Sequence, residues 1–335
     1  MIEIDGSYGE SGGQILRTAV GLSAVTGKPF RIFNIRSGRP NPGLKAQHLK
    51  GIEAVARLCS AELKGARLGS TEITFLPGKI KTEKLRIDVG TAGSVTLVLQ
   101  ALMIPAIRAP EPIEFEITGG THVAWSPTTA YFRHVFSEYL RMMGIEITSE
   151  TVRYGYYPKG GGLIKVKINP EELKPLILEE RGKHIKTEAW SNASRELMKA
   201  CVGERQVNAA ENILKLDKKN IKYVSSYSTG SSITIASNFE NCFLGASSLG
   251  ARGKSAERVG EGAAQKLKKT LDTKATMDKH MTDQILPYLA LSRNKSIVLA
   301  PELTGHAKTN IWVIEKFIDR NFKTQEQKNN VKIEC

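Results

Sequence analysis

The sequence predicts a protein of the α/β (α+β) class, with three βαβαββ repeats packed in one large domain and a small α/β domain inserted into it. The main observation is that hydrophobic periodicity gives the same succession of strands and helices three times along the 335 residues. An acid also recurs at the head of the first helix of each copy, as Asp5, Asp88 and Asp278. Because a repeat of this size cannot bury its sheet alone, we expect the copies to pack around shared apolar faces.

The first two copies are complete in the sequence. The elements expected in the first copy are a strand at 2–5, a helix at 13–26, a strand at 29–35, a helix at 44–59 and strands at 61–64 and 72–76. The second copy has a strand at 85–89, a helix at 94–107, a strand at 113–118, a helix at 127–143 and strands at 145–150 and 162–168. The turn from Pro158 to Gly162 is expected to form a hairpin between the last two strands.

The third copy is interrupted by an insertion. After Asp278 the copy has a helix at 282–291, a strand at 296–300, a helix at 306–317 and strands near 321–324 and 331–334, and residues 174–182 are expected to supply its first strand. The insertion has strands at 185–190, 221–226 and 232–238 and helices at 194–216 and 255–271. We therefore expect a large domain of residues 1–182 and 275–335 and an inserted domain of residues 183–274.

The charge of the chain favours polyanionic partners. The net charge is +14 and the pI is about 9.5, and such a surplus speeds encounter with polyanions. Residues 28–50 contain six Lys or Arg and no acid, whereas the basic run at 252–274 is diluted by acids and is interpreted as a solvated surface.

The composition of 41% hydrophobic and 24% charged residues is that of a soluble globular protein. No stretch of about 18 apolar residues occurs and the N-terminus lacks the apolar core of a signal peptide, so we expect a cytoplasmic protein with no membrane partner. The four cysteines show no CxxC spacing, which argues against a zinc knuckle or a disulfide framework and fits a reducing compartment.

The segment from Asp5 to Arg17 is a glycine-dense loop that runs into an amphipathic helix starting at about Gly13. Glycines allow close backbone approach to a ligand, and a helix start directs free N–H groups at an anion. Glu10 would repel a phosphate unless a divalent cation lay between them, so Glu10 near Arg17 suggests a metal–nucleotide site. The loop matches neither the P-loop nor the dinucleotide fingerprint, and taken alone it favours an ordinary strand-to-helix turn.

Two histidines head helices of the third copy. His306 is expected at a helix N-terminus, where the helix dipole disfavours the imidazolium and keeps the ring neutral, and neutral imidazole is a nucleophile. The alternative is a capping or surface histidine. The segment from His280 to Gln284 begins the preceding helix, and its polar side chains either cap that helix or face a nucleotide.

The segment from Arg36 to His48 is the most unusual of the chain. Two prolines and two glycines make a rigid loop with Arg36 and Arg39, and Gln47 and His48 follow on the first turn of a helix. Arginines on a stiff loop suit bidentate contact with phosphate. This composition favours binding over a purely structural role.

Together these motifs resemble the RNA 3′-terminal phosphate cyclases. The resemblance is carried by Asp5-Gly6 through Gly12-Gly13-Gln14-Ile15-Leu16-Arg17, by Arg36-x-Gly-Arg-Pro-x-Pro-Gly-Leu with Gln47-His48, by Gly119-Gly120-Thr121 and by Asp283-Gln284 after His280. It covers almost the whole chain, including the insertion. It implies the fold described above and an ATP-dependent conversion of RNA 3′-phosphate ends to 2′,3′-cyclic phosphates through a covalent histidine–AMP intermediate and an RNA–ppA end.

The resemblance also implies roles for individual residues. His306 would be the nucleophile, and Glu10 would hold Mg²⁺ or Mn²⁺. The residues implied in ATP binding are Arg17, Gln100, Pro127, His280, Met281, Thr282, Asp283 and Gln284, and those implied in binding the RNA phosphate and the triphosphate are Arg36, Arg39, Gln47 and His48. Three departures from the family pattern, Asn41, His122 and Thr282, touch the RNA and adenine contacts and leave the reacting group in place.

Two other functions share features of this pattern. A non-catalytic cyclase-like protein of ribosome assembly would have the same fold and basic surface without the nucleophile, so the presence of His306 favours the enzyme. A carboxyvinyl transferase would share the repeats but would not need an adenylylated histidine. The sequence specifies neither the oligomeric state nor the physiological RNA.

Overall fold

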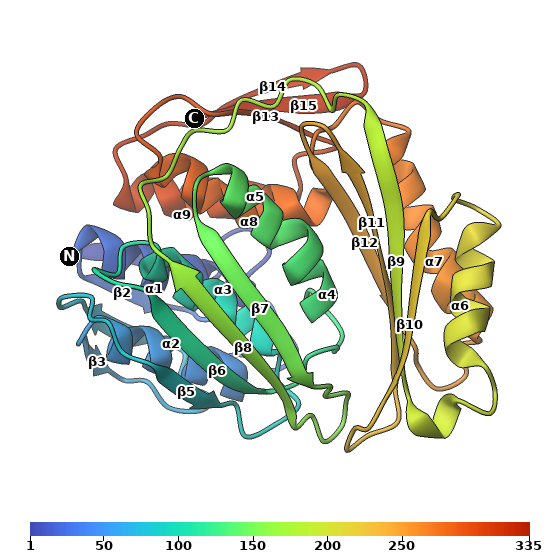
Figure 1. Ribbon diagram of the computed structural model, residues 1–335. Coiled ribbons are helices and arrows are strands. Elements are labelled where there is room, and N and C mark those ends of the chain that lie inside the picture. Colours follow the sequence, from blue (N-terminus) through green and yellow to red (C-terminus); the bar gives the residue numbers. More distant parts are fainter.

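The computed structural model describes residues 1–335 and is a mixed α/β structure with four sheets, which confirms the predicted fold class (Figure 1). The first unit is made of β1 (Ile2–Asp5), α1 (Gly13–Thr26), β2 (Phe30–Phe33), α2 (Ala46–Leu58), β3 (Glu62–Lys64) and β4 (Ile73–Leu76). Its strands lie in the order β1-β2-β4-β3. The β1 and β2 strands are parallel and the other pairs are antiparallel.

The second unit repeats this arrangement with longer closing strands. It contains β5 (Leu85–Asp88), α3 (Val95–Ala106), β6 (Ile113–Gly119), α4 (Thr129–Tyr131), a π-helical turn (Phe132–Phe136), α5 (Ser137–Met142), β7 (Glu146–Arg153) and β8 (Gly162–Asn169). The sheet order β5-β6-β8-β7 corresponds position by position to that of the first unit. The single helix expected at 127–143 is therefore present, with a π-helical turn in its middle. The β7 and β8 strands form the expected hairpin.

The third unit lacks a regular first strand. It contains α8 (Lys279–Leu291), β13 (Ile297–Ala300), α9 (Gly305–Phe317), β14 (Lys323–Gln327) and β15 (Asn330–Glu334), with the sheet order β13-β15-β14. Ile177 forms a single parallel bridge to Ile297, flanked by two backbone hydrogen bonds. The segment expected to supply the strand thus lies beside β13 but pairs with it at a single residue. Pro175, which lacks an N–H donor, limits the ladder on the N-terminal side of this bridge.

Residues 184–271 form a separate sheet with helices on it. The elements are β9 (His184–Ser194), a 3₁₀ turn (Arg195–Leu197), α6 (Val202–Glu211), β10 (Lys218–Val224), β11 (Ser231–Phe239), β12 (Phe243–Leu249) and α7 (Ala256–Leu271), with the sheet order β10-β9-β11-β12. We propose residues 183–274 as an inserted domain. Two expectations for it were wrong: the helix expected at 194–216 is shorter and follows a longer β9, and β12 was missed. Cys201, with φ +48°, breaks the helix at its start, and β12 has small residues buried on both faces, which hides the strand alternation.

The two chain segments that lead into and out of this unit are joined by one side chain. The Arg181 guanidinium donates to the carbonyl oxygens of Thr270 at 2.7 Å, Leu271 at 3.0 Å and Thr273 at 2.8 Å. Its Nε also donates to the carbonyl of Ala275. Entry and exit of the inserted unit therefore lie side by side.

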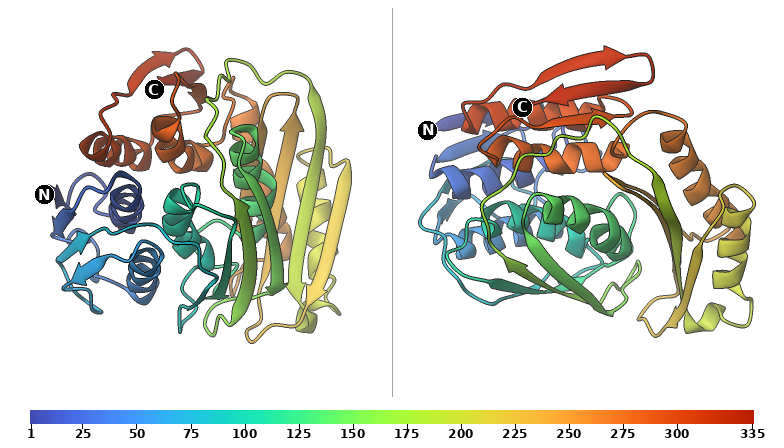
Figure 2. Two further views of the ribbon diagram at one scale, coloured as in Figure 1. Left: turned by 60° about the vertical axis from the view of Figure 1, so that its left-hand side comes forward. Right: turned by 45° about the horizontal axis from the view of Figure 1, so that its top comes forward.

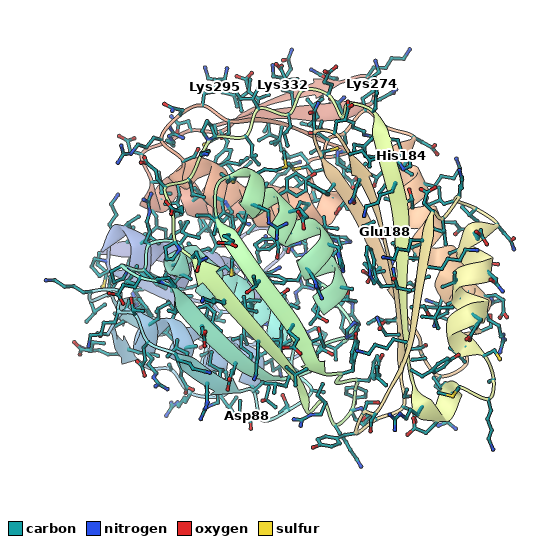
Figure 3. The ribbon with its side chains drawn as sticks, in the orientation of Figure 1. Asp88, His184, Glu188, Lys274, Lys295 and Lys332 are labelled. Carbon is teal, nitrogen blue, oxygen red and sulfur yellow. The ribbon has the colours of Figure 1, made fainter.

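In the part of the molecule formed by the three units, helices lie in the middle and sheets form the outer faces (Figure 2). The α1 helix packs against both α3 and α9, and Gly21 allows the close approach to α3, because a Cβ there would lie 2.8 Å from Ile104. Charged side chains cover the outer sheet faces. On the third sheet, Lys332 pairs with Glu179 at 2.9 Å and Lys295 with Glu334 at 2.9 Å (Figure 3). No helix has both the length and the apolar character needed to cross a bilayer.

Candidate active site

The starts of α1, α8 and α9 meet at one place. The loop between β1 and α1 lies on the first turn of α9, because a Cβ at Gly9 would collide with the Thr309 hydroxyl and one at Gly305 with the Glu10 carboxylate. Tyr8 stacks on Trp312 of α9 with ring centroids 4.0 Å apart. Two glycines and one aromatic pair thus hold this loop against α9.

His306 is the second residue of α9, and its ring faces Glu10. The Thr304 hydroxyl accepts a hydrogen bond from the Ala307 backbone N–H at 3.1 Å and so begins the helix. His306 Nε2 lies 3.0 Å from Glu10 Oε2, and an Arg39 terminal nitrogen lies 3.9 Å from the same oxygen. The His306 side chain is 45% exposed. A histidine, an acid and an arginine therefore share one partly open position.

Several effects set the protonation of His306. Desolvation lowers its pKa, the Glu10 carboxylate raises it, and the cations of Arg17 and Arg39 lower it; the net direction is downward. The ring is therefore neutral near pH 7, as expected for a nucleophile. Nδ1 accepts no hydrogen bond and donates none, so one ring nitrogen is free of protein partners.

Behind His306 lies a hydrogen-bonded network that joins α1, α8 and α9. Gln14 Nε2 donates to Asp283 Oδ2 at 2.8 Å, and Asn310 Nδ2 donates to the Asp283 carbonyl at 2.6 Å. Thr18 Oγ1 donates to Asn310 Oδ1 at 2.6 Å. Sequence analysis missed these partners of Asp283, although Gln14, Arg17 and Thr18 share one face of α1 by their spacing.

Arg17 and Asp283 influence each other inside this network. Burial raises the Asp283 carboxyl pKa to about 7 although Arg17 and Gln14 oppose the rise, and burial lowers the Arg17 pKa to about 10. A cavity of about 30 Å³ adjoins them and is lined in part by Gln100 and Gln284. A half-buried acid, a half-buried cation and a small polar cavity are an arrangement that functional sites often have.

The start of α8 shows which side chains of the segment 280–284 are accessible. His280 is exposed and lies near His306, and Gln284 accepts a hydrogen bond from Gln100 Nε2 at 2.7 Å. Met281 and Thr282 have side chains with no exposed surface. A nucleotide bound to the folded chain as it stands would therefore touch His280, Asp283 or Gln284 rather than these two side chains.

Asp278 precedes α8, and its carboxylate accepts hydrogen bonds from four different groups. Its carboxylate accepts hydrogen bonds from the backbone N–H groups of His280 and Met281, both at 3.0 Å, and from that of Gly245 in β12 at 3.1 Å. The Tyr131 hydroxyl donates to it at 2.8 Å. Asp278 therefore caps α8 and also connects it to the second unit and to the inserted unit.

Pro127, which lies just before α4, is partly exposed. Its carbonyl accepts a hydrogen bond from Thr96 Oγ1 at 2.7 Å.

The arginine loop between β2 and α2 lies against the first loop. The Ser11 hydroxyl accepts a hydrogen bond from the Gly38 backbone N–H at 3.0 Å. Arg39 extends from this loop to Glu10, whereas one terminal nitrogen of Arg36 donates to the carbonyls of Asn41 at 2.7 Å and Gly43 at 2.8 Å. The Arg39 side chain therefore lies at the site beside Glu10. The Arg36 side chain stabilises the conformation of its own loop.

Gln47 and His48 lie on the first turn of α2. Gln47 Oε1 accepts a hydrogen bond from the Ser94 backbone N–H at the start of α3, at 2.9 Å. The His48 ring packs on Gly13 and accepts at Nδ1 from the Lys45 backbone N–H at 3.2 Å. Burial and the nearby cations Arg17, Arg36 and Lys45 lower the His48 pKa to about 3, so this ring stays neutral.

Glu10 is the candidate metal ligand. No group of three or more His, Cys, Asp or Glu side chains is placed to hold a metal. Mg²⁺ needs no such cage, because it commonly keeps several waters and binds through one or two carboxylates together with substrate phosphates. The single, 41% exposed Glu10 carboxylate fits a cation held in that way.

Comparisons with known proteins show the family to which the chain belongs. The family described as RNA 3′-terminal phosphate cyclase matches residues 8–324. The chain belongs to this family. Proteins named RNA 3′-terminal phosphate cyclase from Pyrococcus furiosus and Archaeoglobus fulgidus are 46% and 43% identical to it. The first match covers 97% of this chain and 95% of the relative, and the second 99% and 100%.

A solved structure, the enolpyruvyl transferase NikO from Streptomyces tendae, is similar with a TM-score of 0.40 and 8% identity. The match covers 99% of this chain and 48% of that one. A likeness at this score carries no weight for fold or function.

Proposed function

We propose that this chain is an ATP-dependent RNA 3′-phosphate cyclase that acts in the cytoplasm and forms a covalent adenylate on His306. The observation that carries the proposal is the neutral His306 at the start of α9, 3.0 Å from Glu10 and close to Arg17 and Arg39. Family membership supports the same reaction. A non-catalytic relative would have no use for this group of residues, and no observation favours that alternative.

In the first step an unprotonated ring nitrogen of His306 attacks the α-phosphorus of ATP, a P–N bond forms, and the bond to diphosphate breaks. Arg17 and Arg39 offset the negative charge that develops on the departing diphosphate. Glu10 would hold Mg²⁺ or Mn²⁺, which would supply further neutralisation of that charge. Gln100, His280, Asp283 and Gln284 would orient the nucleoside part of ATP.

In the later steps the RNA 3′-phosphate takes AMP from His306 and forms the RNA–ppA end. The neighbouring 2′-hydroxyl then attacks the 3′-phosphorus, the cyclic phosphate forms, and AMP leaves. Because the 2′-hydroxyl is the reacting group, RNA rather than DNA is cyclised. Arg39 and Gln47 would hold the terminal phosphate, while the neutral, buried His48 would position the loop around it.

The test is incubation of the protein with ATP labelled in the α-phosphate, followed by a denaturing gel. We expect an acid-labile adduct in the wild type and none in His306→Ala, a loss of about 10⁴-fold or more in adduct formation. Lys308→Ala is the matched control, because Lys308 is exposed on the same helix turn and makes no salt bridge. An adduct of normal yield in His306→Ala would contradict the assignment of the nucleophile.

A further inference from the structure

Three segments that the proposed reaction does not use are rich in aromatic and cationic side chains. They are residues 121–127 after β6, 153–161 at the β7–β8 turn and 222–230 at the β10–β11 turn. They contain five of the nine tyrosines of the chain, one of its three tryptophans and no Asp or Glu. Arg153, Lys159 and Lys222 are in the same segments. This composition complements a polyanion that carries flat rings.

The fold brings the three segments together. The Thr121 backbone N–H donates to the Gly155 carbonyl at 2.9 Å, and the Gly155 N–H donates to Thr121 Oγ1 at 2.9 Å. The Lys159 N–H donates to Ser228 Oγ at 3.0 Å, and a Cβ at Gly161 would collide with the Tyr227 ring. The β7–β8 and β10–β11 turns are both seen at the lower edge of the molecule (Figure 1). The large domain and the inserted unit therefore contribute to one surface.

The rings of this surface are open to solvent. Trp125 is 97% exposed, Tyr157 77% and Tyr227 59%. Trp125 has φ +58°, a left-handed conformation that bulky residues rarely adopt without a functional reason. The Arg153 guanidinium lies 5.2 Å from the centre of the Tyr227 ring. Exposed rings beside cations are the usual components of a stacking surface for single-stranded nucleic acid.

This surface is continuous with the proposed phosphate site. A Cβ at Gly93 would lie 3.1 Å from Gln47 Cβ, and one at Gly160 would lie 2.7 Å from Ala92 Cα. The loop before α3 thus joins Gln47 directly to the β7–β8 turn. Asp88, labelled at the lower edge in Figure 3, is an acid next to this loop, and its carboxylate accepts a hydrogen bond from the Gly90 N–H at 2.8 Å.

We propose that the aromatic surface, defined as Trp125, Tyr157 and Tyr227 with Arg153, Lys159 and Lys222, binds the single-stranded RNA nucleotides that precede the terminal phosphate. The bases stack on the exposed rings and the cations offset the backbone phosphates. Stacking of this kind tolerates any base, so the surface favours longer RNA without reading its sequence. The proposal rests on the proposed function, because it takes Gln47 as the position of the RNA end.

The test compares the double variant Tyr157→Ala/Tyr227→Ala with the wild type on two substrates, a dinucleotide 3′-phosphate and a longer single-stranded RNA 3′-phosphate. Because the double variant removes two stacking rings, the KM for the longer RNA should rise roughly thirtyfold or more. The KM for the dinucleotide should rise much less, because the single nucleotide before its terminal nucleotide cannot stack on both rings. Tyr157→Phe/Tyr227→Phe should restore the wild-type KM, and Leu68→Ala, at a 65% exposed site in the β3–β4 turn, is the control.

A second measurement separates this proposal from the proposed function. The Kd of a 3′-hydroxyl RNA oligonucleotide is measured by fluorescence anisotropy, since binding needs no reaction. A weaker Kd in the double variant supports the surface even if the wild type cyclises nothing. An unchanged Kd, or an equal rise in KM for both substrates, overturns the proposal even if cyclisation is observed.

Discussion

Glu10 and Asp278 are acids at the starts of two helices that meet at the same site, but their surroundings are opposite. Asp278 is 2% exposed, and its carboxylate accepts hydrogen bonds from the Tyr131 hydroxyl and three backbone N–H groups. The Glu10 side chain is 41% exposed, and its carboxylate pairs with His306 and Arg39. A carboxylate whose donors are already in place stabilises the fold, whereas one with open positions is available to a ligand.

The largest expected effect that follows from this contrast is on activity. Glu10→Gln keeps the shape of the side chain but removes the charge that would bind a cation, so self-adenylylation should fall by about 100-fold or more. The midpoint of thermal unfolding should stay within about 1 °C, because exposed ion pairs contribute little to stability. Adduct formation is measured with labelled ATP and unfolding by circular dichroism. A normal rate of adduct formation would remove Glu10 from the site.

The opposite behaviour is expected of Asp278. In Asp278→Ala the buried Tyr131 hydroxyl and Gly245 N–H lose their acceptor and α8 loses its cap, so the free energy of unfolding should fall by about 3 kcal/mol. Urea unfolding measures this change. The fraction of protein that stays folded should still form the adduct. Loss of the adduct with an unchanged unfolding midpoint would place Asp278 in the chemistry instead.

Asp283 is intermediate between these two acids, and the effect of its substitution on stability should depend on pH. Its folded-state pKa of about 7 lies above the ordinary value of 3.8, so the folded protein binds more protons than the unfolded chain between these pH values. The contribution of Asp283 to stability is therefore complete below about pH 4 and is lost as pH rises to about 7. Asp283→Asn cannot titrate, so its unfolding midpoint should rise relative to the wild type over this range. A constant difference between the two proteins would contradict the raised pKa.

Much of the fold was predictable because its signals are local. The amphipathic pattern after Gly13 gave the bounds of α1 as the structure has them, and the Pro158–Gly162 turn gave the β7–β8 hairpin. The β12 strand was not predictable by alternation, because its small side chains are buried on both faces. The expected helix is interrupted at Cys201 by a left-handed backbone conformation, which a cysteine in the sequence does not predict.

The candidate site was predictable in its residue types but not in its contacts. The resemblance indicated His306, Glu10 and Arg39, and these three lie together. The partners of Asp283 come from other helices: Gln14 is 269 residues away in sequence and Asn310 is 27 residues away. No local pattern encodes such contacts. Met281 and Thr282 belong to the predicted segment, but the periodicity of α8 turns their side chains into the core.

Arg181 fixes the position at which the chain enters and leaves the inserted unit. Its guanidinium donates to the carbonyls of Thr270, Leu271, Thr273 and Ala275. The segment that enters the inserted unit is therefore bonded directly to the segment that leaves it. We therefore expect changes in the length of the inserted unit to leave the course of the chain from the second sheet to the third unaltered. Under the proposed division into domains, one arginine lies where the inserted domain begins and contacts the segment where it ends.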